Sequence, residues 1–132
     1  MPSKNLAQPC PCGSGRAYLD CCQPIHASVN APTPEALMRS RYSAYVLGLI
    51  DYLMATWHPS TAPGDLELGP TKWLGLEVLD AQQQGDAGVV EFVAKYKVSG
   101  RLHRLHEVSR FVREGMGDAA RWLYIDGQML ED

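Results

Sequence analysis

Four cysteines near the N-terminus have the type and spacing of a metal site. Cys10, Cys12, Cys21 and Cys22 follow a C-x-C-x8-C-C pattern. Structural zinc is held in a tetrahedron by four sulfur or nitrogen ligands, and a full set of four leaves no open position for catalysis. The glycines between the two cysteine pairs let the main chain fold close around the sulfurs. The pattern therefore predicts one structural Zn²⁺ per chain.

Redox chemistry is the alternative for these cysteines. A disulfide between the neighbours Cys21 and Cys22 would be strained, which favours a metal. The chain begins Met-Pro-Ser-Lys without an apolar leader, and its most apolar stretch, residues 45–54, is too short and too interrupted to span a bilayer. We therefore expect a cytoplasmic protein with reduced thiols. His26 is a spare metal ligand, but we expect it to be a solvated loop residue.

A predicted strand over residues 101–113 carries the other candidate chemistry. Its alternation leaves open which face is buried, because one face holds Glu107 and Ser109 and the other holds His106. A polar group in an apolar cavity is costly unless it is paired, so it often marks a functional site. Glu107 or His106 would act there as a general acid or base. The alternative is an ion pair that fixes helix to sheet, for which Glu107 has three candidate partners: Arg39, Arg41 and Arg110.

The helices that must position these residues come first in the chain. A 3.6-residue period predicts a helix over residues 34–47, with Thr33 as its N-cap and Gly48 as its end. A shorter helix over residues 51–57 follows, and Pro59 stops it. The next stretch, up to Pro70, contains several prolines and glycines and is predicted to be a loop.

From residue 71 onward the apolar residues alternate with a period of two, which predicts strands. Turns are expected at residues 82–86, 99–100 and 115–118, with the last strand over 121–125. Short turns join antiparallel neighbours, so the predicted fold class is α+β: N-terminal helices packed in a curved, cone-like, four-stranded antiparallel meander. Such a sheet would leave a pocket at its open end. The predicted lining of this pocket is Tyr42, Tyr45, Trp57, Phe92, Tyr96, Glu107, Ser109, Phe111 and Trp122.

Composition divides the chain and limits its functions. Residues 1–27 are rich in Pro, Gly and Cys and are predicted to form a zinc knuckle, residues 28–33 a linker, and residues 34–132 the α+β domain. The net charge is −3 and the longest Lys/Arg run is shorter than three residues. Binding to nucleic acid through the phosphate backbone needs many basic contacts, so the charge argues against that class of partner.

The cysteine segment resembles the SEC-C motif, a zinc knuckle first named from a translocation ATPase. The likeness covers residues 8–24, includes a Pro-Cys-Gly-Ser-Gly run, and places the four cysteines on the ligand positions of that motif. It implies an interaction module that contacts a protein, the ribosome, the translocation machinery or a membrane surface. We therefore expect a protein partner.

The rest of the chain resembles the YchJ-type family of uncharacterised bacterial proteins. The likeness lies in residues 37–45, 55–59, 106–111 and 122–127. It implies a SEC-C knuckle joined to a domain similar to nuclear transport factor 2, and relatives often carry a second knuckle after the domain, which is not seen before Asp132. Two hypotheses follow. The chain is a zinc-binding adaptor whose cone binds a ligand or forms a homodimer, or it is a small-molecule hydrolase or isomerase with an acid–base residue in the cone.

Overall fold

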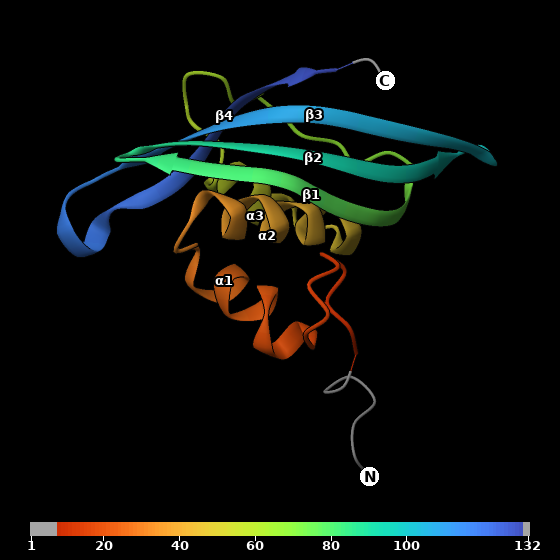
Figure 1. The fold of residues 1–132 in the computed structure, drawn as a ribbon, viewed down its shortest axis with the longest axis horizontal. Coiled ribbons are helices and arrows are strands. Elements are labelled where there is room, and N and C mark those ends of the chain that lie inside the picture. The colour runs from red at the N-terminus through yellow and green to blue at the C-terminus, as the bar shows by residue number, and fades with distance from the viewer. Residues whose placement is uncertain (1–7, 131–132) are drawn as a thin grey trace, which may run out of the picture.

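The computed structural model describes residues 8–130 and shows a layered α+β fold (Figure 1). A curved sheet covers helices α2 (Pro34–Leu47) and α3 (Ile50–Ala55), and α1 (Cys22–Ser28) lies on the far side of α2 together with the cysteine segment. The predicted fold class is confirmed: helices precede a four-stranded antiparallel sheet. Two short 3₁₀ turns, Tyr18–Asp20 and Gly117–Ala119, complete the elements.

Helix α2 begins and ends where its sequence predicts. The Thr33 hydroxyl accepts a hydrogen bond from the Ala36 amide at 3.0 Å, and Pro34 occupies the first turn, where its missing amide hydrogen costs nothing. Gly48 ends the helix in the left-handed conformation with φ 75°. Helix α3 is shorter than predicted, because Trp57 leaves the helix to form an isolated bridge with Tyr124.

The sheet is a simple meander in the order β1-β2-β3-β4, all antiparallel. Its strands are β1 (Lys72–Gln84), β2 (Ala87–Val98), β3 (Arg101–Glu114) and β4 (Arg121–Met129). The β2–β3 turn holds Ser99 at φ 52° and Gly100 at φ 79°, the conformation that a two-residue turn needs to match the twist of the strands.

The first hairpin turn is tighter than the sequence suggests. Residues 82–84, predicted to be part of a turn, belong to β1, and only two residues separate β1 from β2. Both strands extend beyond the part of the sheet that α2 covers. The polar glutamines of β1 therefore stay exposed although they are paired in the sheet.

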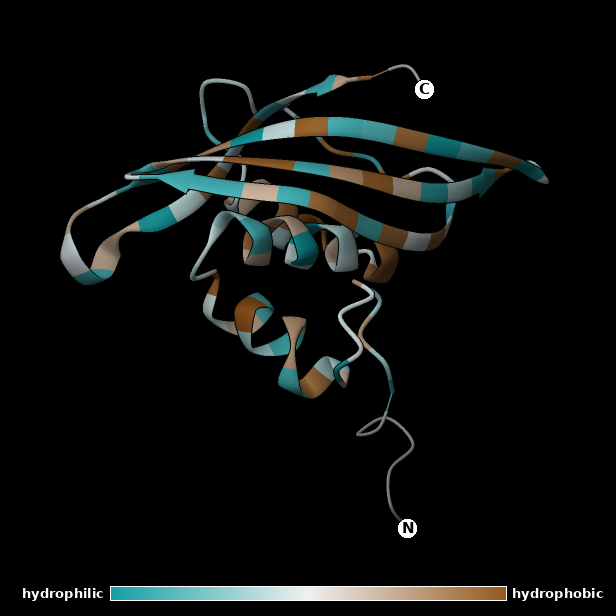
Figure 2. Ribbon diagram, in the orientation of Figure 1, coloured by the Kyte–Doolittle hydropathy of each residue, from teal (hydrophilic) through white to brown (hydrophobic). Residues whose placement is uncertain are grey.

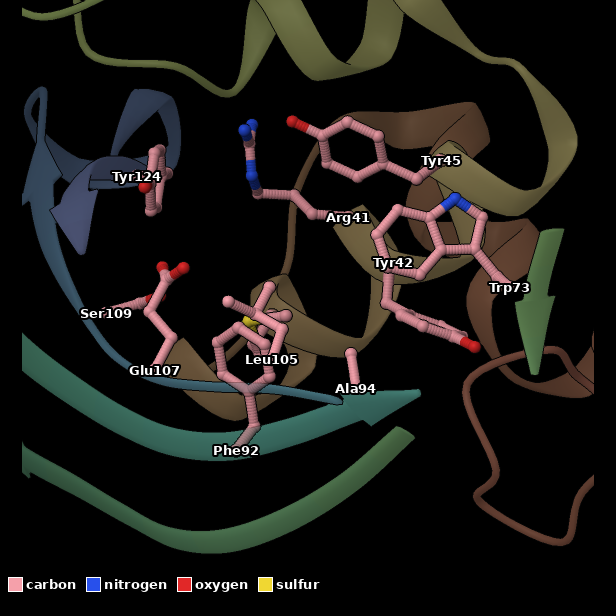
Figure 3. Close-up of a pocket in the computed structure, with 11 residues that line it drawn as sticks. Arg41, Tyr42, Tyr45, Trp73, Phe92, Ala94, Leu105, Glu107, Ser109 and Tyr124 are labelled. Carbon is pink, nitrogen blue, oxygen red and sulfur yellow. The ribbon is translucent and has the colours of Figure 1, made fainter. Parts of the chain in front are cut away.

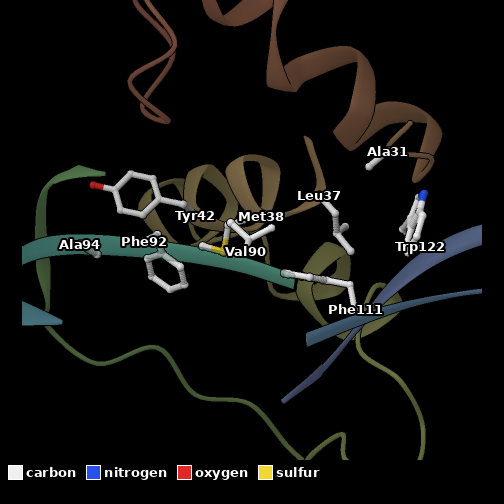
Figure 4. Close-up of a cluster of buried hydrophobic side chains, with 9 residues drawn as sticks. All are labelled: Ala31, Leu37, Met38, Tyr42, Val90, Phe92, Ala94, Phe111 and Trp122. Carbon is white, nitrogen blue, oxygen red and sulfur yellow. The ribbon is translucent and has the colours of Figure 1, made fainter. Parts of the chain in front are cut away.

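The core lies between α2 and the concave face of the sheet (Figure 4). Hydrophobic and hydrophilic residues alternate along the strands, as Figure 2 shows, so each strand gives one face to this core. The register settles which face of β3 is buried: Ser109 and Phe111 are 1% and 2% exposed, while Arg110 between them is exposed. The core residues are Ala31, Leu37, Met38, Tyr42, Val90, Phe92, Ala94, Phe111 and Trp122.

Candidate functional site

The four cysteine sulfurs come together in one cluster. All four lie within 4.8 Å of one another, and the Cys12 and Cys21 sulfurs are 3.6 Å apart. A tetrahedral site with metal–sulfur bonds of ~2.3 Å places its sulfurs about 3.8 Å apart. The four cysteines are free of disulfides, and Cys10, Cys12 and Cys22 are buried. The cluster therefore has the ligand set and the spacing of a metal site.

The electrostatics of the cluster also favour a cation. A hydrogen bond from Cys22 lowers the pKa of Cys12 to about 4, and the same bond, together with burial, raises the pKa of Cys22. Sulfurs this close compete for protons, because a second thiolate would repel the first. A divalent metal removes this conflict and binds all four thiolates.

The cluster is attached to the main domain by helix α2. The Ser43 hydroxyl donates to the Cys22 sulfur at 3.3 Å and lies 3.5 Å from the Cys10 sulfur. One turn earlier, Arg39 Nη1 donates to the Cys12 carbonyl at 3.0 Å. Hydrogen bonds from such outer groups orient metal ligands and moderate their charge. Helix α2 therefore supplies part of the environment of the sulfurs.

His26 has a different role from the one predicted. It lies half-buried on α1, not in a solvated loop, and both ring nitrogens are engaged. Its Nε2 lies 2.8 Å from the Ser40 carbonyl, which only accepts, so Nε2 carries the hydrogen and the Tyr18 hydroxyl donates to Nδ1 at 2.7 Å. Burial lowers the pKa of His26, which favours this neutral form. The ring joins the cysteine segment to α2.

A second candidate site is a pocket between α2 and the concave face of the sheet. Its volume is about 250 Å³, below the range of roughly 300–1,000 Å³ that is usual for drug-sized ligands. Figure 3 shows side chains from α2, β1, β2, β3 and β4 that surround it. The lining consists of Met38, Arg41, Tyr42, Tyr45, Trp73, Phe92, Ala94, Leu105, Glu107, Ser109 and Tyr124.

Arg41 is the unusual member of this lining. It is only 4% exposed, and its Nη1 donates to the Leu53 carbonyl at 2.8 Å and to the Thr56 hydroxyl at 2.7 Å. The guanidinium lies 4.9 Å from the Trp57 ring centre and 4.6 Å from that of Tyr124. Burial lowers the pKa of Arg41, although an arginine still stays charged at neutral pH. The pocket wall thus contains a buried cation.

Glu107 faces the same pocket from β3. The Ser109 hydroxyl donates to its Oε2 at 2.7 Å, and its carboxylate lies against Gly127, where a side-chain carbon would clash with it. Burial, and secondly the charge of Glu107, raise the pKa of Tyr124 to about 12. Glu107 is therefore held as an acceptor at the pocket wall.

The predicted ion pair between Glu107 and an arginine is not formed within residues 8–130. Arg39 instead pairs with Glu35 at 2.9 Å, and Arg110 pairs with Asp126 through two 2.7 Å bonds on the outer face of the sheet. In the same part of the chain, Arg41 donates to the Leu53 carbonyl and to the hydroxyls of Thr56 and Tyr45, none of which is charged. The helix and the sheet are joined by apolar packing rather than by this pair.

The remaining predicted pocket residues lie elsewhere. His106 points to the outer face, where its Nε2 lies 2.7 Å from Glu91 Oε2, so it does not reach the cavity in which an acid or base was expected. Phe111 and Trp122 pack in the core, and Tyr96 stacks on His103 near the end of the sheet. The Trp57 ring packs against the Arg41 guanidinium and is not part of the pocket lining. The predicted residues that do line the pocket are Tyr42, Tyr45, Phe92, Glu107 and Ser109.

Trp73 and Tyr124 line the pocket although the sequence predicts no role for them, and for Arg41 it predicts only an ion pair. A signal for Arg41 was present, because it lies three residues after Met38 and four before Tyr45, on the apolar stripe of α2. A charged side chain within such a stripe is buried, so it needs hydrogen-bond acceptors or an opposite charge nearby. Trp73 and Tyr124 gave no such signal, since their place depends on the sheet register.

Comparisons with known proteins agree with this architecture. Residues 33–127 match a family described as YchJ, middle NTF2-like domain, and residues 7–24 match the SEC-C motif. Within residues 8–130, no helix has the length and apolar character needed to cross a membrane.

Relatives and solved structures extend the likeness to nearly the whole chain. A UPF0225 protein of Cupriavidus metallidurans is 59% identical over 93% of this chain and 90% of its own length, and one of Ralstonia nicotianae is 54% identical over 98% and 96%. A SEC-C motif containing protein from Psychrobacter arcticus has a TM-score of 0.77 and 30% identity, covering 98% of this chain and 87% of its own. RPA3114 from Rhodopseudomonas palustris, also a SEC-C motif containing protein, has a TM-score of 0.75 and 33% identity, covering 92% and 98%. The chain therefore belongs to the uncharacterised UPF0225, or YchJ, family, with an N-terminal SEC-C motif followed by an NTF2-like domain.

Proposed function

We propose that the protein is a cytoplasmic, non-catalytic binding protein, in which a zinc knuckle contacts a protein partner and the cone domain binds a small ligand. One observation carries this proposal: the sulfur cluster and the pocket are built on opposite sides of helix α2. Ser43 approaches the sulfurs, while Arg41 and Tyr45 line the pocket. A metal that stabilises the knuckle would therefore also stabilise helix α2, which forms one wall of the pocket.

The metal in this proposal is Zn²⁺, and its role is structural. Four cysteines are the soft ligand set that zinc prefers, and a filled tetrahedron leaves no position for a reacting water. Four thiolates around a dication carry a net charge of about −2. The Ser14 hydroxyl, 3.1 Å from the Cys21 sulfur, and the Ser43 hydroxyl help to offset that charge.

The partner surface in this proposal is the exposed side of the knuckle, residues 13–20. Leu19 is 37% exposed and lies outside the cysteine cluster. Arg16 is exposed beside it and donates to the Asp20 carbonyl. This face therefore offers one apolar and one cationic side chain for contact with a protein, the ribosome and the translocation machinery included.

A capture experiment with matched variants tests the proposal. Immobilised wild-type protein, Cys12→Ser, Leu19→Ser and Leu102→Ser are compared in a lysate, with zinc measured in each. Leu102 is 64% exposed on β3, beside the β2–β3 turn and outside the knuckle, and serves as the control. We expect a specific partner to bind wild type and Leu102→Ser, and to be lost with Cys12→Ser and with zinc-loaded Leu19→Ser. Equal capture by all four proteins would contradict the proposal.

An enzyme is the second candidate, and Glu107 supports it. Its carboxylate faces an aromatic pocket and has no arginine partner among residues 8–130, which is the setting expected of a general base. A hydrolase or isomerase would then use Glu107 as the acid–base group and Arg41 to bind an anionic substrate. Turnover of a carboxylate or ester that is lost in Glu107→Gln, with ligand binding kept, would favour this candidate over a binding protein.

A further inference from the structure

The buried guanidinium of Arg41 lacks a counter-charge within residues 8–130. Its hydrogen-bond acceptors are the Leu53 carbonyl and the hydroxyls of Thr56 and Tyr45, all of them uncharged, and the ion pairs of this region all involve other residues. An arginine has five N–H donors, and these three bonds, two of them from Nη1, leave donors for a ligand. A buried charge is costly unless an opposite charge accompanies it. The pocket beside Arg41 has room for that charge.

The helix holds Arg41 rigidly toward this space. The Trp57 and Tyr124 rings lie within 4.9 Å of its guanidinium carbon and hold the side chain in place by cation–π contact. Figure 3 shows the guanidinium beside the Tyr45 hydroxyl, on the pocket side of α2. A fixed guanidinium binds a planar carboxylate through two parallel hydrogen bonds. The position therefore suits one carboxylate.

The walls of the pocket favour a ligand with a flat, apolar ring. Trp73, Phe92 and Leu105 cover its sides, and the Tyr42 ring meets Trp73 edge-on with ring centres 5.6 Å apart. Aromatic rings pack well against such walls in edge-to-face or offset geometry. The volume of about 250 Å³ restricts the occupant to a small molecule, such as one substituted ring.

The wall opposite the helix adds a second polar requirement. Glu107 projects from β3 toward the pocket, and the Ser109 hydroxyl holds its Oε2. This carboxylate repels a second anionic group and accepts a hydrogen bond from a hydroxyl or amino group. Arg41 and Glu107 are therefore expected to bind different ends of the ligand.

From these contacts we propose that the pocket binds a small aromatic carboxylate, with Arg41 as its counter-ion and Glu107 as the acceptor for a hydroxyl or amino group at its other end. The proposal rests on the ligand-binding half of the proposed function and adds the chemical class of the ligand. It is independent of the partner that contacts the knuckle.

Isothermal titration calorimetry with three probes tests it on the zinc-loaded full chain. The probes are 4-hydroxybenzoate, the uncharged isostere 4-hydroxybenzamide, and benzoate. We expect 4-hydroxybenzoate to bind about tenfold or more tightly than the amide, because the amide loses the charged contact with Arg41. Benzoate should bind about threefold to tenfold more weakly than 4-hydroxybenzoate, because it lacks the group that donates to Glu107.

Matched variants locate these effects. Arg41→Met keeps an unbranched side chain between the two rings and should abolish the preference for the acid, while Glu107→Ala should abolish the preference for the hydroxyl. Arg110→Met makes the same change to an arginine that pairs with Asp126 on the outer face, and should bind like wild type. Circular dichroism melts show whether each variant is folded. If Arg41→Met does not fold, the comparison of acid and amide binding to the wild type tests the proposal by itself.

The outcomes separate this inference from the function on which it rests. Equal binding of acid and amide, or unchanged acid binding by folded Arg41→Met, would overturn the charge assignment and leave ligand binding intact. Inorganic phosphate, titrated in addition as a non-aromatic anion, should bind more weakly than 4-hydroxybenzoate, and equally tight binding would overturn the aromatic part. If none of the three probes binds, the inference fails, and the proposed ligand-binding role loses its support from this pocket.

Discussion

Residues 8–28 and the cone domain bury very different side chains. In residues 8–28 the buried positions are Cys10, Cys12 and Cys22, while the cone packs leucine, valine, methionine and aromatic side chains between α2 and the sheet. A segment this small cannot offset its lost chain entropy by apolar burial, so it needs another source of order. The sulfur cluster is that source if it binds a metal. Helix α2 belongs to both regions, since its two sides face the sulfurs and the core.

The largest expected effect is the loss of a cysteine ligand. Structural zinc contributes on the order of 10 kcal/mol or more to the folding of small zinc domains. Cys12→Ser should therefore abolish binding of about one zinc per chain and unfold residues 8–24, while residues 34–126 stay folded. Plasma mass spectrometry measures the zinc, and a ¹H–¹⁵N correlation spectrum shows which amides lose their dispersion. Collapse of the whole spectrum would show that the two regions do not fold independently.

A core truncation should have the next largest effect, and only in the cone. Phe111 is 2% exposed, so Phe111→Ala should lower the free energy of unfolding by about 3–5 kcal/mol through lost burial and the cavity left behind. Leu19→Ala in the knuckle should change it by less than about 0.5 kcal/mol, because Leu19 is exposed. Urea denaturation followed by tryptophan fluorescence measures both. Equal costs at the two sites would remove the distinction between the regions.

Tyr52, where α3 meets α1, should make stability depend on high pH. Burial raises its pKa to about 12 from 10.0. The unfolded chain then loses the Tyr52 proton first as pH rises, so the contribution of Tyr52 to the free energy of unfolding is constant below about pH 10 and falls by about 2–3 kcal/mol between pH 10 and 12. Tyr124, whose pKa is also raised to about 12, adds a fall over the same range, so Tyr52→Phe should remove part of the slope. Denaturant titrations across this range check the slope. The same slope in Tyr52→Phe would assign it to other groups.

The smallest expected effect is the removal of the hydroxyl that joins the two regions. Ser43→Ala should destabilise the protein by about 1 kcal/mol and weaken zinc binding about 10–100-fold. It should also reduce the rise in melting temperature that we expect zinc to give to the cone. Ser14→Ala removes a hydroxyl whose described contacts, with Cys12, Cys21 and the Arg16 amide, all lie within the knuckle, so it should weaken binding but keep that thermal response. An unchanged thermal response in Ser43→Ala would exclude this link.

The parts that local sequence determines were predictable. The cap at Thr33, the left-handed Gly48 and the Ser99–Gly100 turn each follow from the conformation that a single residue permits. The cysteine spacing likewise predicted the cluster, because its residues are close in sequence. Fold class, strand order and the sulfur cluster were therefore accessible from the chain alone.

The parts that depend on tertiary contacts were not. Helix α1 contains Pro24 and few apolar residues, so its sequence resembles that of a loop. The helix is stabilised by packing of Ile25 and Val29 against residues of α2 and α3, which local sequence does not reveal. The bond from Ser43 to a sulfur joins residues 21 positions apart, and nothing in a serine predicts a metal neighbour. The direction of Glu107 needed the pairing register of β3, which a mixed polar and apolar strand leaves open.

Hydrogen exchange with and without zinc tests the central claim most directly, namely that a metal orders the knuckle, burial orders the cone, and α2 joins them. Chelation should abolish protection of amides in residues 8–24, partly reduce it in α2 near Ser43, and leave the central amides of β2 and β3 unchanged. Uniform loss of protection, or none, would contradict the claim. Loss in the knuckle with no change in α2 would show that the knuckle is ordered by metal but not joined to the pocket helix.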